Sequence, residues 1–200
     1  MIDPGNITNY NLTDRELEEH VLFWICAAGK NGRTAARCLD NMLTDHAVFY
    51  QNNSPFNWIM RAHSLYDLPQ ILKHYGIGCY NGKAKTFFEL AVAKYKDKLN
   101  LRTCSAEDLE KIHGIGMKTS RCFIMHSRYG ARYAGLDTHL LKYLKAQGIE
   151  DVPKATPSSK KQYLSLEKEF LKIADEQGKL PSVLDLEIWN KYSMKSTARA

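Results

Sequence analysis

A lysine and an aspartate are the residues of this sequence that are best placed for chemistry. Lys118 stands in the first turn of a predicted helix, where the positive end of the helix dipole disfavours the ammonium form and favours a nucleophilic amine. Asp137 comes 19 residues later, just before another predicted helix, and its carboxylate is suited to stabilising a positive charge or moving a proton. Two plainer interpretations stay open: Lys118 as a surface contact for phosphate, and Asp137 as a helix cap alone.

The residues before Lys118 predict a tight glycine turn between two helices. Residues 109–125 read L-E-K-I-H-G-I-G-M-K-T-S-R-C-F-I-M, with Gly114 and Gly116 around an apolar isoleucine. Glycine can adopt a positive φ and leaves the backbone bare, so we expect the N–H groups at the start of the second helix to point outward. Such a turn can bind a phosphate of a nucleic-acid backbone without reading a base. An ordinary helical hairpin is the alternative.

The elements that carry these residues are predicted to be helices. Apolar residues three and four positions apart dominate, and alternating runs rich in Val, Ile and Thr are scarce, so we expect an all-α protein. Helices are expected over about 13–28, 33–44, from Ser54 and Pro55 onward, 68–74, 82–97, after Ser105, 137–148, 160–177 and 183–192. The predicted helix-hairpin-helix covers about 106–129.

Composition excludes several classes of protein. The chain has 200 residues, of which 44% are hydrophobic and 25% charged, and this excludes a disordered chain, a collagen or a coiled coil. The net charge of +6 permits a polyanionic partner such as nucleic acid. No apolar run approaches the roughly 18 residues needed to cross a bilayer, and the first ten residues lack a secretory signal. We therefore expect a protein that stays inside the cell and off the membrane.

The cysteines indicate neither a metal site nor a disulfide framework. There are five, no two lie within ten residues of each other, and no C-x-x-C pair occurs. None follows Cys122, which makes a four-iron iron–sulfur cluster a poor fit because such a cluster needs four cysteine ligands that are usually grouped. We expect reduced thiols, no metal and no cofactor.

The sequence resembles the helix-hairpin-helix DNA glycosylases, the superfamily of endonuclease III and 8-oxoguanine DNA glycosylase. The run H-G-I-G-M-K followed by L-D-T-H places Lys118 and Asp137 at the family's catalytic lysine and aspartate. F-W-I-C-A-A-G-K-N-G is similar to the first core helix and DNA-inserting loop, and H-Y-G-I-G-C-Y-N-G-K-A-K to the helix entry before the hairpin. L-D-L-E-I-W is similar to the C-terminal helix of the short, cluster-free 8-oxoguanine glycosylases.

The resemblance implies a fold and a reaction. The fold is one glycosylase unit over residues 1–200, built of two helical lobes with a catalytic cleft between them and with helices 158–193 closing a base pocket. In the reaction the sugar develops positive charge as the base leaves, and Asp137 would stabilise it. Lys118 would attack the sugar and form a Schiff base, which makes neighbouring sugar hydrogens acidic and permits strand nicking by β-elimination.

The resemblance also implies roles for residues beyond that pair. His139 matches a position that contacts DNA phosphate, with a histidine on the helix surface as the alternative. Cys122, four residues after Lys118, matches a cysteine in the base pocket, although a free cysteine is often just a small buried hydrophobe. Lys30 and Asn31 match residues that fill the gap left by a flipped-out nucleotide. A plain polar turn is the alternative for these two.

Two further residues fall on the last predicted helix. Trp189 and Asp185 are four positions apart and share a helix face, so Trp189 could stack on a base and Asp185 could accept a purine N–H. The alternative is a tryptophan in the core. The remaining polar residues near these motifs are interpreted as solvated charges (Lys83, Lys85, Arg121, Lys142 and Lys145) or as structural (His113).

These observations favour a bifunctional DNA glycosylase/AP lyase that excises 8-oxoguanine in base-excision repair. Its expected partner is double-stranded DNA containing an oxidised base, and we expect a monomer that works with the DNA of the cell. Two alternatives remain: an endonuclease III-like enzyme for oxidised pyrimidines or another altered base, and a non-enzymatic module whose hairpin only grips phosphate. Gripping phosphate alone would require neither Lys118 nor Asp137.

Overall fold

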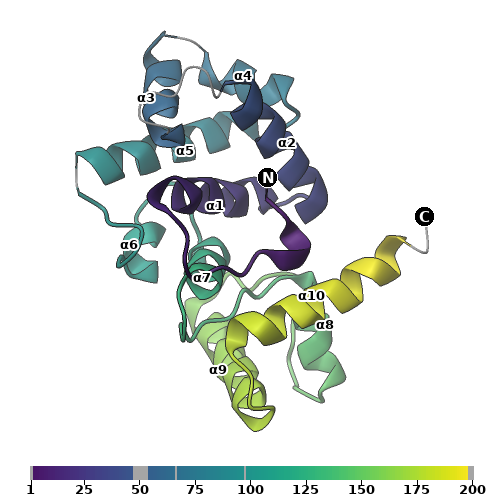
Figure 1. Ribbon diagram of the computed structural model, residues 1–200. Helices are drawn as coiled ribbons and strands as arrows, with labels where there is room; N and C mark the ends of the chain where they lie inside the picture. Colours follow the sequence, from purple (N-terminus) through teal and green to yellow (C-terminus); the bar gives the residue numbers. More distant parts are fainter. Residues whose placement is uncertain (1, 47–53, 66, 97, 198–200) are drawn as a thin grey trace. The chain divides into compact units, whose positions relative to one another are not determined.

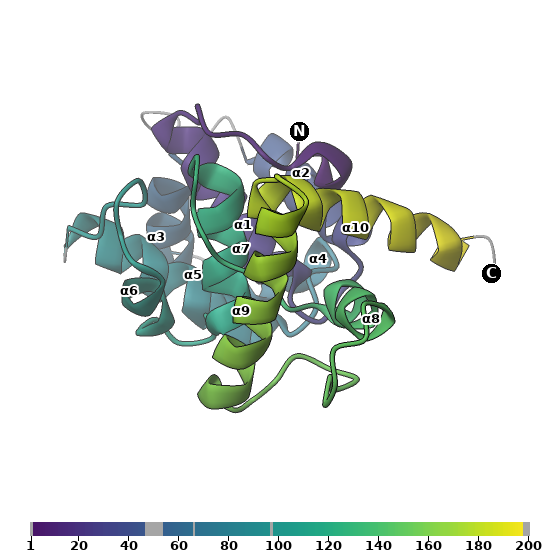
Figure 2. The same ribbon diagram turned by 90° about the horizontal axis from the view of Figure 1, so that it is seen from below.

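The structure is a computed structural model that describes residues 2–46, 54–65, 67–96 and 98–197. These residues form ten α-helices and one short 3-10 helix and contain no β-strand (Figure 1 and Figure 2). In chain order the elements are η1 Pro4–Asn6, α1 Asp14–Ala27, α2 Gly32–Asp45, α3 Pro55–Leu65, α4 Leu68–His74, α5 Tyr80–Tyr95, α6 Ala106–Glu110, α7 Met117–Ser127, α8 Thr138–Ala146, α9 Lys160–Glu176 and α10 Pro181–Thr197. The predicted all-α class is confirmed. The last helix is longer at both ends than the predicted 183–192.

The chain divides into two compact units. The first contains Asn11–Phe123 with the first few residues of the chain, and so α1 to α6 and the first part of α7. The second contains Gly5–Tyr10 and the chain from Ile124 onward, and so the end of α7 together with α8, α9 and α10. In the described part of the chain, no helix is both long and apolar enough to span a membrane.

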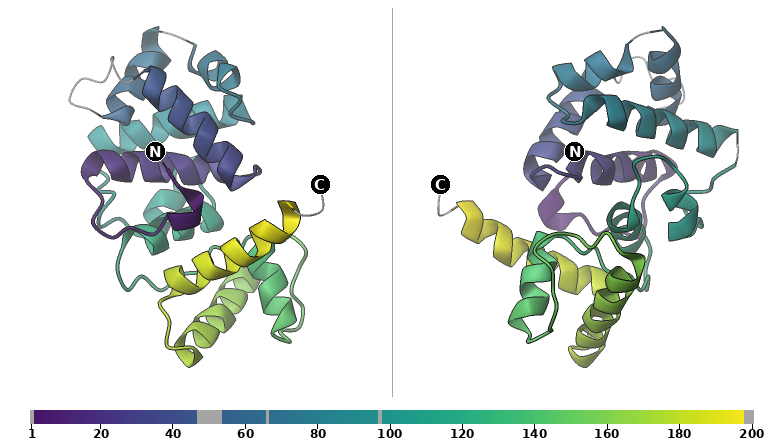
Figure 3. Two further views of the ribbon diagram at one scale, coloured as in Figure 1. Left: turned by 45° about the vertical axis from the view of Figure 1, so that its right-hand side comes forward. Right: turned by 180° about the vertical axis from the view of Figure 1, so that it is seen from behind.

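In the first unit, α5 packs beside α3 and α4, and α1 packs beside α2 (Figure 3). Local signals explain where the helices start: the Thr13 side chain accepts from the Glu16 N–H and the Glu16 carboxylate accepts from the Thr13 N–H, which is the predicted capping box. The core of this unit is formed by large buried side chains that include Leu22, Phe23, Leu39, Phe56, Ile59, Phe87 and Leu90.

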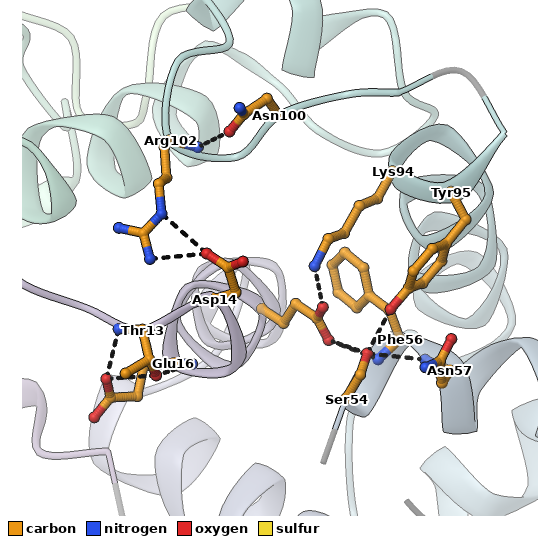
Figure 4. A network of polar contacts seen from close by, with 11 residues as sticks. Thr13, Asp14, Glu16, Ser54, Phe56, Asn57, Lys94, Tyr95, Asn100 and Arg102 are labelled. Carbon is orange, nitrogen blue, oxygen red and sulfur yellow. Dashed lines mark hydrogen bonds and ion pairs between the residues drawn. The ribbon is translucent and has the colours of Figure 1, made fainter. Parts of the chain in front are cut away.

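A buried carboxylate links three helices of the first unit (Figure 4). Glu18 of α1 is 1% exposed and accepts hydrogen bonds from the Ser54 hydroxyl at 2.7 Å and the Phe56 N–H at 2.9 Å. Its other oxygen pairs with Lys94 of α5. Because every one of these partners donates to the ionised form, the buried charge is compensated, and it also satisfies an N–H at the start of α3.

In the second unit, α10 packs beside α8 and α9. The N-terminal segment Gly5–Tyr10 is attached to this group by the Asn9 N–H, which donates to the His126 carbonyl at 2.9 Å, and by a 2.7 Å hydrogen bond between the Tyr10 and Ser182 hydroxyls. Its core includes Leu140, Leu141, Leu144, Tyr163, Phe170 and Leu184. The N-terminal segment therefore packs with helices that come more than 100 residues later in the sequence.

Candidate functional site

The predicted hairpin is present, with α6 and α7 joined by a tight turn. Ser105 caps α6 through the predicted N-terminal signal, and Ile112 and Ile115 anchor the turn in the core. Gly114 has a φ of +81°, a conformation that favours glycine. A Cβ at Gly114 would also overlap the hydroxyl of Thr86 on α5, so a side chain there would be strained and would force Thr86 to shift.

Gly116, the second glycine of the turn, does not use the positive φ that glycine permits. Its φ is not positive, and a Cβ built on it would meet no atom within 4 Å. Neither conformation nor packing within the described residues therefore requires glycine at this exposed position. The bare backbone of Gly116 instead leaves open the start of α7, whose first N–H groups have no partners within the helix.

Lys118 is the second residue of α7 and is half-buried. The helix is held to α6 by a charged pair one turn further on: Arg121, which is 1% exposed, pairs with Glu110, and Ser120 donates to the same carboxylate at 2.8 Å. The prediction that Arg121 is a solvated charge was wrong. The residues beside Arg121 in the sequence gave no sign that Glu110 would pair with it inside the fold.

Asp137 is the N-cap of α8, as predicted, and is half-buried. Its Oδ1 accepts from the N–H groups of His139 and Leu140, both at 2.8 Å. Both bonds end on the same oxygen, so Oδ2 takes part in neither of them. The carboxylate can therefore cap the helix and still offer an oxygen to a substrate.

The backbone that leads to Asp137 is held by α9, which sequence reasoning did not connect with the site. The Tyr163 hydroxyl donates to the Ala134 carbonyl at 2.7 Å and accepts from the Leu136 N–H at 3.2 Å. The Glu167 carboxylate accepts from the Ala134 N–H at 2.9 Å. All of these residues are buried, so this segment has its peptide groups satisfied by side chains and not by a helix or sheet.

Cys122 and His139 were predicted to contact the base and a DNA phosphate, respectively. Cys122 is 2% exposed on α7, which fits both a pocket wall and a small buried hydrophobe. His139 is half-buried in the first turn of α8, and its ring lies 6.3 Å from that of Tyr192. The His139 Nδ1 is buried and has no hydrogen-bond partner among the described residues. The predicted roles of Cys122 and His139 stay predictions.

Asp185 and Trp189 both lie on α10 and are both half-buried. Asp185 does not stand alone: its Oδ2 is 3.1 Å from Nε2 of His126, a fully buried histidine at the end of α7. Sequence reasoning missed His126. Its spacing could have drawn attention to it, because His126 lies eight residues after Lys118, about two turns further along the same helix.

The side chains of the loop after α1 form hydrogen bonds within the first unit. Lys30 Nζ donates to the Gly76 carbonyl, and Asn31 caps α2 by accepting from the N–H groups of Arg33 and Thr34. Lys83 donates to the carbonyls of Cys26 and Ala28 at 2.9 and 3.1 Å. The prediction that Lys83 is a solvated charge was wrong, because its side chain is buried.

Burial also shifts the pKa values of Lys83 and Cys26. Desolvation lowers the pKa of Lys83 from its ordinary value. The same cause raises the pKa of the Cys26 thiol to about 12, so this cysteine stays protonated and unreactive near neutral pH. The hydrogen bonds from Lys83 to the carbonyls of Cys26 and Ala28 fix the end of α1, directly before Gly29.

Comparison with known proteins gives concordant matches. A family model described as 8-oxoguanine DNA glycosylase matches residues 10–179. The chain is 38% identical over 77 residues to the 8-oxoguanine DNA glycosylase/AP lyase of a Thermotoga species (strain RQ2), a match that covers 38% of this chain and 36% of that relative. The aligned segment therefore spans about a third of the curated relative.

Solved structures of the same kind share the fold. The 8-oxoguanine DNA glycosylase of Thermotoga maritima superposes with a TM-score of 0.66 at 24% identity, over 88% of this chain and 79% of that chain. The 8-oxoguanine glycosylase/lyase of Methanocaldococcus jannaschii, in complex with DNA containing 8-oxoguanine, gives a TM-score of 0.63 at 21% identity, over 90% and 81%. Because the family model spans most of its length, this chain belongs to the 8-oxoguanine DNA glycosylase family.

Proposed function

We propose that this protein is a base-excision repair enzyme, a bifunctional DNA glycosylase/AP lyase that removes 8-oxoguanine. The family match over residues 10–179 carries the proposal. The position of Lys118, in the first turn of α7 directly after the open turn, supports it. The curated Thermotoga relative is a glycosylase/AP lyase, and the Methanocaldococcus relative has been solved with DNA containing 8-oxoguanine.

In the proposed reaction, Asp137 stabilises charge on the sugar and Lys118 acts as the nucleophile. The C1′–N bond breaks as the base leaves with the bonding electrons and takes up a proton, while the Asp137 carboxylate stabilises the positive charge that develops on the sugar. The unprotonated amine of Lys118 bonds to C1′, and ring opening gives a Schiff base. Loss of a C2′ proton then expels the 3′ phosphate by β-elimination, and water releases the lysine.

The proposed partner is double-stranded DNA, bound by the chain as a monomer. The N–H groups at the start of α7 and the bare backbone at Gly116 provide a phosphate site in which the helix dipole favours negative charge. His139 would hold a second phosphate. The net charge of +6 supports the attraction to a polyanion. The scheme uses neither a metal nor a cofactor.

Excision requires a pocket for the flipped-out nucleotide and a side chain that fills the space it leaves in the duplex. We propose that Cys122, Asp185 and Trp189 contact the base and that Lys30 and Asn31 enter the gap. Because Lys30 is bonded to the Gly76 carbonyl and Asn31 caps α2, insertion by either side chain would require these hydrogen bonds to be exchanged on DNA binding.

Borohydride trapping tests this proposal directly, because it reduces a Schiff base to a stable protein–DNA bond. The protein is incubated with duplexes containing 8-oxoguanine opposite cytosine, thymine glycol, an abasic site or no damage. We expect a covalent band with the 8-oxoguanine and abasic duplexes. Lys118→Gln should lose the band, whereas Lys172→Gln, at an exposed position on α9, should keep it.

Each other outcome has a defined meaning. A band on thymine glycol and not on 8-oxoguanine would move the substrate to oxidised pyrimidines. Retention of the band in Lys118→Gln would remove the lysine from its role. Binding without a band on any duplex would contradict the enzyme and favour a phosphate-gripping module.

A further inference from the structure

A buried histidine in the second unit connects the N-terminal segment with α10. His126 is 0% exposed, and both of its ring nitrogens have partners. Nδ1 lies 2.7 Å from the Thr8 hydroxyl oxygen, and Nε2 lies 3.1 Å from Oδ2 of Asp185. We call Thr8, His126 and Asp185 the histidine relay.

The chemistry of the partners assigns the protons in the relay. An ionised carboxylate can only accept, so Nε2 carries the proton and donates to Asp185. In the neutral ring Nδ1 is then an acceptor, which matches a proton donated by the Thr8 hydroxyl. Each ring nitrogen then makes a hydrogen bond of the correct direction.

The ends of the relay are held in place by backbone and hydroxyl contacts. The Asn9 N–H donates to the His126 carbonyl at 2.9 Å, directly after Thr8. The Tyr10 hydroxyl hydrogen-bonds at 2.7 Å to Ser182, in the first turn of the helix that carries Asp185. These contacts restrict the histidine and thereby the orientation of the carboxylate that it contacts.

Asp185 is the member of the relay that keeps access to the surface. Its side chain is 15% exposed, against 1% for that of His126. A carboxylate offers about four acceptor sites on its two oxygens, so it can accept hydrogen bonds from several donors at once. Trp189, one helical turn further along α10, adds a half-buried aromatic ring. An aromatic ring beside an oriented carboxylate suits a flat base with N–H donors.

We infer that His126 is a positioning residue for base recognition, which it serves by orienting Asp185 toward the paired N–H donors of a guanine-type base, N1–H and the exocyclic amine. This inference rests on the proposed function and deepens it. A carboxylate accepts from both donors at once, whereas the corresponding edge of a thymine derivative presents one N–H between two carbonyl groups. Thr8 acts one step further away, by fixing the ring of His126.

The test compares two reactions of one protein. Excision of 8-oxoguanine requires the base pocket, whereas nicking of an abasic duplex uses Lys118 with no base present. In single-turnover assays we expect His126→Leu to slow excision about tenfold and to leave abasic nicking within about twofold of wild type. His126→Gln, which can still donate an N–H to Asp185, should recover most of the excision rate.

A double variant separates positioning from a general packing effect. If His126 acts through Asp185, then His126→Leu combined with Asp185→Ala should excise no more slowly than Asp185→Ala alone. Thr8→Val changes a half-buried hydroxyl to a methyl group and should slow excision in the same direction by a smaller factor. It also serves as the test if His126→Leu folds poorly by circular dichroism.

The outcomes distinguish this inference from the proposed function. Parallel losses of excision and abasic nicking, fully additive effects of the two substitutions, or unchanged excision in Thr8→Val and His126→Leu would overturn the histidine relay. A wild-type protein that nicks abasic DNA but excises no 8-oxoguanine would overturn the proposed substrate, and with it the inference.

Discussion

The hydroxyl of Tyr163 lies 2.7 Å from the carbonyl oxygen of Ala134, in the core of the second unit. The same hydroxyl accepts the N–H of Leu136. One side chain on α9 therefore satisfies two buried peptide groups just before Asp137. Since a buried peptide group without a partner is costly, this contact fixes the backbone from which the Asp137 carboxylate projects.

Tyr163→Phe should destabilise the protein by about 1–3 kcal/mol, because it leaves a carbonyl and an N–H unpaired in the core. Urea unfolding measures the free energy. The matched control is Tyr143→Phe, which removes a hydroxyl that accepts from Gln177 at an exposed contact on the surface. Equal losses of stability in the two variants would contradict a special role for the Tyr163 hydroxyl.

Asp137→Asn should separate the cap from the chemistry. Asparagine caps helices about as well as aspartate, so the free energy of unfolding should change by less than about 1 kcal/mol. Excision should fall by about 100-fold or more, because the negative charge facing the sugar is lost. Single-turnover kinetics with an 8-oxoguanine duplex provide the measurement. Unchanged excision would leave Asp137 as a cap alone.

The two hairpin glycines should respond differently to alanine. Gly114→Ala should cost about 1–3 kcal/mol of stability, because alanine must adopt a positive φ and meets the Thr86 hydroxyl. Gly116→Ala meets neither obstacle and should keep its stability. It should instead weaken DNA binding if a phosphate approaches the backbone there, which titration at constant salt would measure. Destabilisation of both variants alike would contradict this distinction.

Glu110→Gln should destabilise the hairpin by about 2 kcal/mol or more, because the buried guanidinium of Arg121 loses the negative charge of Glu110. Thermal and urea unfolding provide the readout. Glu187→Gln removes the carboxylate of an exposed pair with Lys179 and should cost less than about 1 kcal/mol. Replacing Arg121 by Met in the Glu110→Gln background should restore part of the loss, and a further loss would count against the explanation.

The helices and their ends followed from local patterns. The capping box of Thr13 and Glu16, the Ser105 cap and the Asp137 cap are all present. These signals act over three or four residues, so a single sequence contains them completely. The same reasoning allowed a positive φ at both hairpin glycines, and of the two only Gly114 has one. Chemical identity permits such a conformation without requiring it.

The sequence by itself determined an all-helical protein, a hairpin with Lys118 at the start of its second helix, and an aspartate that caps the next helix. It also contained the family resemblance, which the family model confirms. The assigned roles of individual residues stay predictions. Each of these features is encoded by spacing within a short stretch of chain.

The tertiary structure decided which polar groups are buried and what they contact. Arg121 and Lys83 are enclosed by the fold, and His126 meets Asp185 from 59 residues away. The Tyr163 hydroxyl reaches Ala134 across 29 residues. Such pairs depend on how whole helices pack. A buried polar group without a hydrogen-bond partner is costly, so it pairs with a group that the packing brings near it. No local pattern in the chain specifies that partner.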